Sequence, residues 1–232
     1  SLNIPAVMGV HRATAHLLTD EVLVVDGETG TVIADADLAT IAHYRRRLRA
    51  LGRRRNRLRQ LIDKPAITAD GTEIELLANL ELPEDVAAAR TYGARGIGLY
   101  RTEFLYMNRA DLPDEAEHFT TYSELVRGLA GTPITIRSID LGADKQVGTA
   151  DALEPGCNPP LGLRAIRLCL KEPSLFRPQL RAILRAAALG PVRLMLPMIT
   201  SLNEVETIFA LIADIKEELR SEGLAFDAAM PV

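Results

Sequence analysis

From about residue 73 onward, short apolar runs alternate with longer stretches in which apolar residues recur at helical spacing. The predicted strands are residues 73–80, 96–103, 132–140 and 192–199, and residues 230–232 would begin a fifth. Five helices are predicted. The first begins at Pro83, three more span about 114–129, 161–170 and 174–188, and the last runs from a Ser201–Glu204 capping box to about Glu222. Repeated strand–helix units predict a parallel sheet, because parallel strands need a crossover connection. No strand order is visible, so half of a (β/α)8 barrel and an open sheet both fit.

The first 64 residues follow a different pattern. Residues 22–25 and 31–33 are β-branched runs on either side of the glycine-containing loop 26–30, which predicts a β-hairpin. Between residues 37 and 62, apolar residues recur at spacings of three, four and seven, which predicts one long helix. The hairpin is too short to bury a core of its own. We therefore expect it to complete a larger domain and the helix to join two domains.

The predicted long helix carries nine arginines between Arg45 and Arg59. Such a run could bind an anionic partner such as nucleic acid or a membrane surface. It could equally be a solvated face whose long side chains cover apolar surface. The formal net charge of −4 and the pI near 5.7 favour the second interpretation and argue against a dedicated nucleic-acid binder. No apolar run is long enough to span a bilayer, so no membrane partner is predicted.

Both ends of the chain are unusual for a natural protein. The sequence starts at Ser1 without a methionine and stops in the apolar stretch 229–232, whereas domain ends are usually polar. We interpret the chain as an internal piece of a longer protein. Its two cysteines, Cys157 and Cys169, lack metal-site spacing and suggest a reducing cytoplasm. Because Trp is absent and aromatic residues make up only 4%, we expect an aliphatic core.

Candidate functional residues follow the predicted strands, at the end of a parallel sheet where sites gather. The strand at 96–103 ends in Arg101 and Glu103, and the strand at 132–140 ends in Arg137 and Asp140. A third cation, Arg164, lies in the loop 158–164 that leads into a helix. Converging arginines suit a small polyanion, because guanidinium binds carboxylate and phosphate as a planar fork. Ion pairs that tie the strand ends together explain the same residues equally well.

Other chemical motifs are weak. Lys145, in the loop 141–145, could bind phosphate, but a plain surface turn is the simpler interpretation. The glycines at 93, 96 and 98 lead into a strand rather than a helix, which does not match a dinucleotide-binding motif. None of the four histidines, His11, His16, His43 and His118, is predicted to be catalytic or to bind a metal. His43 and His118 fall within helical patterns and are expected on helix surfaces.

Several segments together resemble a known family. Residues 96–107, Gly-Ile-Gly-Leu-Tyr-Arg-Thr-Glu-Phe-Leu-Tyr-Met, resemble a motif of phosphoenolpyruvate-utilising enzymes. Residues 137–145 resemble the following strand of the phosphoenolpyruvate-protein phosphotransferases, which are Enzyme I of the bacterial sugar phosphotransferase system. Further matching segments fall in the expected order, at 4–9, 26–30, 161–167, 179–186 and 196–199. The resemblance covers essentially the whole chain.

This resemblance implies an α/β fold with three parts. Residues 1–36 would be the C-terminal remnant of a swivelling phosphohistidine domain, and residues 37–64 an Arg-rich linker helix. Residues 65–232 would be the N-terminal half of a phosphoenolpyruvate-binding (β/α)8 (TIM) barrel, about its first four βα units.

The resemblance also implies a reaction. The family moves the phosphoryl group of phosphoenolpyruvate to an enzyme histidine and then to a histidine-containing phosphocarrier protein, with Mg²⁺ neutralising the phosphate. Arg101 and Arg137 match the arginines that hold phosphoenolpyruvate, and Arg164 lies in a motif near the same site. The complete protein would be a cytoplasmic homodimer.

Three features of the family are missing from this sequence. The phosphorylated histidine lies in a Ser-His motif upstream of Ser1, and the Mg²⁺ ligands and the catalytic cysteine lie beyond Val232. Cys157 and Cys169 do not match that cysteine, so no residue present is expected to be catalytic or to bind metal. The chain alone is therefore expected to be inactive.

Competing interpretations remain. Pyruvate phosphate dikinases and phosphoenolpyruvate synthases share the Gly-Ile-Gly-Leu-x-Arg-Thr-Glu strand, and a nitrogen-related or multidomain relative of Enzyme I is also compatible. A non-catalytic interaction piece, docking an acidic partner on its Arg-rich helix, is an alternative of a different class.

Overall fold

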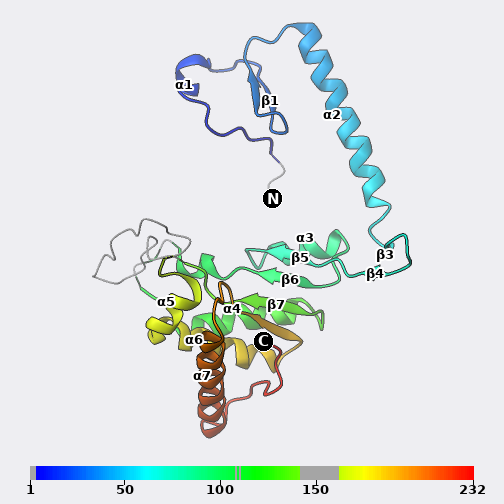
Figure 1. Ribbon diagram of the computed structural model, residues 1–232. Coiled ribbons are helices and arrows are strands. Elements are labelled where there is room, and N and C mark those ends of the chain that lie inside the picture. The colour runs from blue at the N-terminus through cyan, green and yellow to red at the C-terminus, as the bar shows by residue number, and fades with distance from the viewer. Residues whose placement is uncertain (1–3, 108, 110, 142–161) are drawn as a thin grey trace. The chain divides into compact units, whose positions relative to one another are not determined.

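The computed structural model describes residues 4–107, 109, 111–141 and 162–232 (Figure 1). The chain divides into two compact units, Ser1–Lys64 and Pro65–Val232. Lys145 and Cys157 fall outside the described residues.

The first unit contains a short helix, a β-hairpin and a long helix. The short helix α1 spans Ala13–His16. Strands β1 (Val24–Asp26) and β2 (Thr31–Ile33) pair antiparallel, which confirms the predicted hairpin. Helix α2 spans Leu38–Arg59 and begins after Asp37, whose carboxylate accepts a hydrogen bond from the Thr40 N–H at 2.6 Å. The helix is tied to the hairpin by Arg47, which pairs with Asp26 at 2.6 Å and Glu28 at 3.1 Å.

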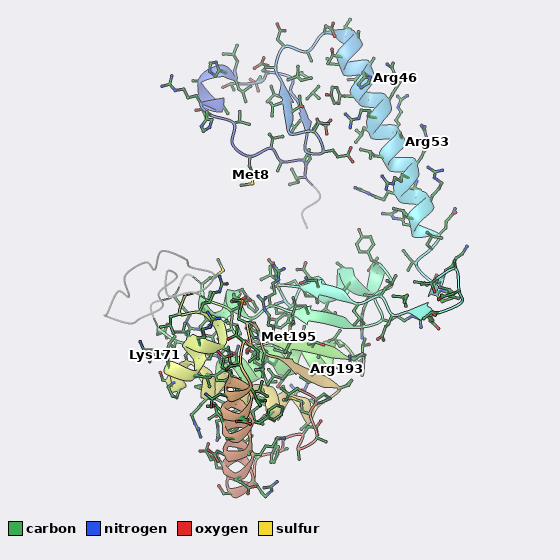
Figure 2. The ribbon with its side chains drawn as sticks, viewed as in Figure 1. Met8, Arg46, Arg53, Lys171, Arg193 and Met195 are labelled. Carbon is green, nitrogen blue, oxygen red and sulfur yellow. The ribbon has the colours of Figure 1, made fainter. Side chains whose placement is uncertain are left out.

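Helix α2 has no buried residue within the described part of the chain. Its arginines are exposed apart from Arg47, which is half-buried, and Figure 2 shows Arg46 and Arg53 extending from the helix. The predicted apolar stripe is largely exposed too, with Leu48 69% and Leu58 54% accessible. The unit by itself therefore does not cover the stripe.

The second unit begins with a small hairpin that the sequence did not predict. Strand β3 (Ala66–Ile67) pairs antiparallel with β4 (Glu73–Ile74). The single strand predicted at 73–80 is therefore wrong: its start belongs to this hairpin and its end to a separate sheet. The cause is the turn at 68–72, where Gly71 adopts a positive φ of 88° and the Thr68 N–H donates to the Thr72 carbonyl. This local closure pairs Glu73 with Ile67.

The main sheet is parallel and four-stranded, as the strand–helix alternation predicted. Its strands lie in sequence order: β5 (Ala78–Leu80), β6 (Ile97–Tyr100), β7 (Ile134–Arg137) and β8 (Val192–Met195). The connections carry α3 (Asp85–Thr91), the 3-10 helix η1 (Glu103–Tyr106), α4 (Glu115–Gly128), α5 (Ala165–Lys171) and α6 (Pro173–Ala187), and α7 (Leu202–Ser221) follows β8. The capping box predicted at Ser201–Glu204 is present.

One face of the sheet forms the core with helices α4 and α6. On β7 and β8 the residues Ile134, Ile136, Val192 and Leu194 are buried, whereas the alternate side chains are more exposed and Met195 is 43% accessible. The sequence predicted an aliphatic core, but the core also contains aromatic side chains. Its largest fully buried side chains include aromatic residues at the sheet–helix boundary, namely Tyr100, Tyr122 and Phe176.

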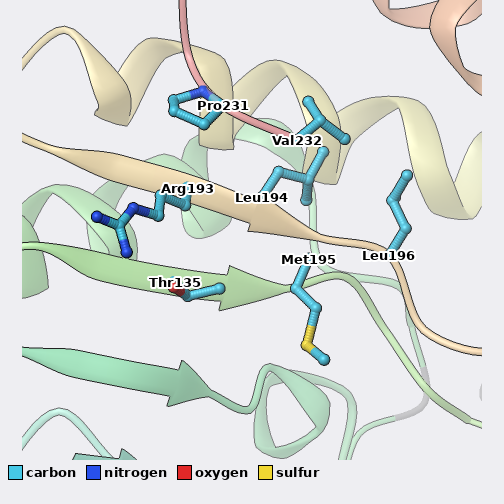
Figure 3. A pocket seen from close by; sticks show the side chains of 7 residues that line it. All are labelled: Thr135, Arg193, Leu194, Met195, Leu196, Pro231 and Val232. Carbon is cyan, nitrogen blue, oxygen red and sulfur yellow. The ribbon is translucent and has the colours of Figure 1, made fainter. Parts of the chain in front are cut away.

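The predicted strand at 230–232 is not formed. The Pro231 carbonyl nevertheless accepts a hydrogen bond from the Leu194 N–H at 2.9 Å, as a strand beside β8 would. Next to this edge lies an open cavity of about 420 Å³, lined by Thr135, Arg193, Leu194, Met195, Leu196, Pro231 and Val232 (Figure 3). None of the three candidate arginines lines this cavity.

Candidate functional site

Two of the candidate arginines follow neighbouring parallel strands. Arg101 comes directly after β6 and Arg137 ends β7, so both lie at the carboxyl edge of the sheet. Close packing of the two strands explains the glycine that opens the 96–107 motif. A Cβ atom at Gly96 would lie 2.8 Å from the Pro133 carbonyl oxygen, so a larger residue would push the strands apart.

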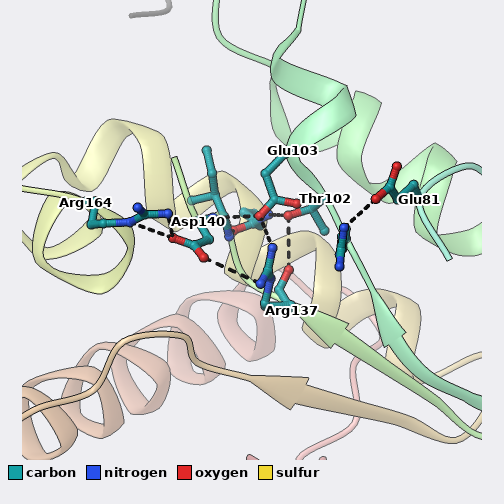
Figure 4. A network of polar contacts seen from close by, with 9 residues as sticks. Glu81, Thr102, Glu103, Arg137, Asp140 and Arg164 are labelled. Atoms are coloured by element: carbon teal, nitrogen blue, oxygen red, sulfur yellow. Dashed lines mark hydrogen bonds and ion pairs between the residues drawn. The ribbon is translucent and has the colours of Figure 1, made fainter. Parts of the chain in front are cut away.

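Arg137 is the most enclosed of the three, with 19% of its side chain exposed. Its Nη2 pairs with Glu103 Oε1 at 2.7 Å, and its Nη1 lies 3.5 Å from Asp140 Oδ2 (Figure 4). Glu103 Oε1 also accepts the Asp140 N–H at 3.0 Å. The turns after β6 and β7 are thereby joined through charge-assisted hydrogen bonds.

Arg164 lies at the N-terminus of α5 and joins the same cluster. Its Nη2 and Nε lie 2.8 Å and 3.1 Å from Asp140 Oδ1. Asp140 therefore pairs with both Arg137 and Arg164, and it links these two candidate arginines.

Arg101 has a different environment. Its Nη1 pairs with Glu81 Oε1 at 2.5 Å, and the two side chains are 43% and 63% exposed. Such an exposed pair contributes little to stability, typically about 0–1 kcal/mol. Arg101 can therefore change partners at small cost, whereas the enclosed pairs of Arg137 cannot.

The predicted alternative of ion pairs at the strand ends is present for all three arginines. Yet some buried polar atoms of the cluster have no hydrogen-bond partner among the described residues: Arg101 Nε, Glu103 Oε2 and Arg137 Nε. Buried polar atoms are nearly always satisfied in folded proteins. Both guanidinium Nε–H groups are closed to solvent, so an anion would reach them only after the surrounding side chains move.

A buried chain of hydrogen bonds lies behind the arginines, and the sequence did not predict it. Gln179 of α6 donates from Nε2 to Thr102 Oγ1 at 3.1 Å and to the Tyr122 hydroxyl at 3.2 Å. The Tyr122 hydroxyl lies 3.0 Å from His118 Nδ1, and His118 Nε2 lies 3.1 Å from the Tyr106 hydroxyl. A signal was available, because Gln179 is a polar residue spaced three and four positions from buried Phe176 and Ile183 on one helix face.

The prediction that His118 lies on a helix surface is wrong. The side chain is fully buried, and burial lowers the pKa of His118 to about 4. Helix α4 places His118 on the same face as Tyr122, one turn later, and both point into the core rather than to solvent. The other three histidines, His11, His16 and His43, are exposed.

The described cysteine and carboxylates are not arranged for nucleophilic or metal chemistry. Cys169 is buried, and burial raises the pKa of its thiol to about 12. Among the described residues, no group of three His, Cys, Asp or Glu side chains could hold a metal ion. Glu103 and Asp140 are held by arginines, so the residues present do not fit a Mg²⁺ site. No helix in the described part of the chain is long and apolar enough to cross a membrane.

A parallel α/β unit with arginines at its strand ends suits the binding of a small anion. Comparison with known proteins shows the family to which this unit belongs. A family model described as the phosphoenolpyruvate-binding domain of phosphoenolpyruvate-utilising enzymes matches residues 55–232. The chain belongs to this family.

The curated relatives compared below all carry the name of one enzyme. The chain is 47% identical over 234 residues to a phosphoenolpyruvate-protein phosphotransferase of Cupriavidus necator, covering 100% of this chain and 40% of the relative. It is 41% identical over 223 residues to the enzyme of the same name from Staphylococcus carnosus, covering 96% of this chain and 39% of the relative. An enzyme of that name from Geobacillus stearothermophilus is 41% identical over 225 residues, covering 97% and 39%. The chain thus spans about two-fifths of the length of these relatives.

Proposed function

We propose that this chain provides the phosphoenolpyruvate-binding part of a phosphoenolpyruvate-protein phosphotransferase. One observation carries the proposal: Arg101 and Arg137 stand at the carboxyl ends of adjacent parallel strands β6 and β7. That edge is where ligands bind in parallel α/β folds. The names of the relatives supply the identity of the ligand.

The substrate carries a carboxylate and a phosphate, and both are geometric matches for guanidinium groups. In this proposal Arg101 leaves its exposed partner Glu81 to bind the substrate. Arg137 keeps its pairs with Glu103 and Asp140 and contributes positive charge from the neighbouring strand. Arg164 contributes positive charge from the other side of Asp140.

The strand order supports a barrel rather than a doubly wound sheet. The strands add in the order β5, β6, β7, β8, with no reversal of direction. The exposed face that carries Arg193 and Met195 would then line the barrel interior. Residues 65–232 are accordingly assigned to the first half of a TIM barrel. Residues 37–64 are assigned to a linker helix, and residues 1–36 to the end of a phosphohistidine domain.

The complete reaction needs groups outside this chain. In the proposal, phosphoenolpyruvate phosphorylates a histidine upstream of Ser1, and the phosphoryl group passes to a histidine-containing phosphocarrier protein. Mg²⁺ would be bound by carboxylates beyond Val232 and would neutralise charge on the phosphate. The complete protein would act as a cytoplasmic homodimer, and the chain alone would not turn over.

A chimera with a relative tests this proposal. The chain would replace the matching segment of the Cupriavidus necator enzyme, to which it is 47% identical. The chimera would be incubated with labelled phosphoenolpyruvate and Mg²⁺ without nucleotide, then with a phosphocarrier protein. We expect an acid-labile label on histidine that passes to the carrier. The unaltered Cupriavidus enzyme is the positive control.

Two substitutions separate binding from stability. Arg101→Ala should abolish labelling at low substrate concentration while lowering the free energy of unfolding by less than about 1 kcal/mol, because its ion pair is exposed. Arg137→Ala should also destabilise the fold, by about 3 kcal/mol, because it leaves Glu103 partly buried without a counter-ion, whereas Asp140 keeps its pair with Arg164. Urea denaturation measures both changes.

Each other result has a definite meaning. Full labelling in Arg101→Ala would refute its role in binding. A folded chimera that takes no label would refute the transferase assignment.

A further inference from the structure

We propose that Gln179 is a positioning residue for the arginine site, which rests on the function proposed above. Gln179 belongs to α6 and is fully buried, and its side-chain hydrogen bonds in the described part of the chain go to residues other than the candidate arginines. Its amide joins the turn after β6 to the turn after β7. The amide therefore adds a buried side-chain bridge to the backbone pairing and the Arg137–Glu103 ion pair, which also hold Arg101 and Arg137 in place.

The orientation of the Gln179 amide is fixed by its partners. Its Oε1 accepts the Ile139 N–H at 3.0 Å, and a backbone N–H can only donate. The Nε2 group must then face the other way, where its two N–H bonds reach Thr102 Oγ1 and the Tyr122 hydroxyl. All the hydrogen-bonding groups of the amide are directed at named atoms, and none is left for water.

The contacts of Gln179 lead directly to the arginine cluster. Thr102 accepts from Gln179 and donates its hydroxyl hydrogen to the Arg137 carbonyl at 3.1 Å. Thr102 is the neighbour of Arg101 in sequence, so this bond links the two arginine positions across the strands. Ile139, held by the other end of the amide, directly precedes Asp140, which contacts Arg137 and Arg164.

The same amide also sets the direction of the buried chain behind it. Tyr122 accepts from Gln179, so its own hydroxyl hydrogen is free to donate to His118 Nδ1. A histidine that accepts at Nδ1 and is neutral carries its hydrogen on Nε2, which then donates to the Tyr106 hydroxyl. Gln179 thus selects one tautomer of His118, which provides a spectroscopic signal of its own orientation.

No other residue reproduces these contacts. Asn is shorter by one methylene, Glu lacks both N–H donors, and Met has a similar shape without either donor or acceptor. Gln179→Met therefore removes the hydrogen bonds with the smallest change in volume. Ile183→Val is a matched control, because Ile183 is also fully buried on α6, one turn later, and makes no side-chain hydrogen bond.

The kinetic test uses the chimera described above. In Gln179→Met we expect KM for phosphoenolpyruvate to rise about 10-fold or more with kcat changed less than about 3-fold, because the arginines hold the substrate before and during transfer. Ile183→Val should leave both constants within about 2-fold although it loosens the same helix. Thr102→Val should raise KM similarly, and the double variant Thr102→Val/Gln179→Met should be less than additive.

A second measurement does not depend on activity. In the 232-residue chain, ¹⁵N NMR should show His118 as a single neutral tautomer protonated at Nε2, and Gln179→Met should produce a mixture of tautomers. Unchanged KM in Gln179→Met within an active chimera would overturn the positioning role and leave the proposed function intact. An inactive chimera with intact Gln179 would overturn the proposed function itself. An unchanged tautomer in Gln179→Met would overturn the hydrogen-bond directions.

Discussion

The buried histidine of α4 makes the stability of this protein strongly dependent on pH. His118 is neutral and enclosed between Tyr106 and Tyr122, with ring centroids 5.5 Å from each. Burial is the main cause that lowers its pKa to about 4, from 6.5 in an exposed histidine. Protonating Nδ1 would also place a hydrogen against the hydroxyl hydrogen of Tyr122, which Gln179 orients toward the ring.

The magnitude follows from the difference between the two pKa values. Because the unfolded chain binds the proton more readily than the folded chain, stability is full above the unfolded pKa and falls as the pH falls toward the folded pKa. The shift from 6.5 to about 4 corresponds to about 3 kcal/mol in total. Of this, about 2 kcal/mol should be lost between about pH 7 and pH 5.

Urea denaturation from about pH 7 down to about pH 4 measures this loss, with His118→Gln as the reference. Carboxylates and the exposed histidines titrate in both proteins, so the difference between the two curves isolates His118. The free energy of unfolding of the wild type minus that of His118→Gln should be about 2 kcal/mol smaller at about pH 5 than at about pH 7, because only the wild type loses the contribution of His118. Parallel curves for the two proteins, or an NMR titration of His118 near its ordinary value, would refute the reasoning.

Two further predictions concern single side chains. Burial raises the pKa of the Cys169 thiol to about 12 from 9.0, so near neutral pH it should react with iodoacetamide about 1000-fold more slowly than a free thiol. In urea it should react at an ordinary rate, and fast labelling of the native Cys157→Ser protein would contradict this prediction. Ser201→Ala should lower the free energy of unfolding by about 1 kcal/mol, because the capping box of α7 loses the hydrogen bond that the Glu204 N–H donates to Ser201 Oγ. Ser201→Asp is the control that keeps the cap, and an unchanged Tm in Ser201→Ala would contradict this prediction.

Sequence periodicity predicted most of the fold because strand and helix patterns are local. The hairpin at 24–33, the helix from 38 and the capping box at Ser201 lie where the sequence placed them. The failure at 73–80 arose because the segment, Glu-Ile-Glu-Leu-Leu-Ala-Asn-Leu, contains no glycine or proline to mark where one sheet ends and another begins. That division depends on the turn at Gly71.

The arrangement of the site was predictable only in part. The positions of Arg101 and Arg137 at the strand ends follow from the strand pattern. Their partners do not, because Glu81 is 20 residues from Arg101 and Glu103 is 34 residues from Arg137 in sequence. The misplacement of His118 has a similar cause: a single polar residue in an amphipathic helix is expected to face solvent unless its buried partners are known.

The balance of charge at the strand ends determines which arginine can bind substrate first. Three arginines face three carboxylates there, so the cluster is formally neutral before any ligand arrives. A polyanion that displaced Glu103 from Arg137 would leave that carboxylate partly buried without a counter-ion, at a cost of several kcal/mol. Displacing Glu81 from Arg101 costs less than about 1 kcal/mol, because Glu81 returns to water. In the proposed function, Arg101 is therefore the residue that meets the anion first, and the enclosed cluster, held in register by Gln179, is the fixed surface against which the anion would bind.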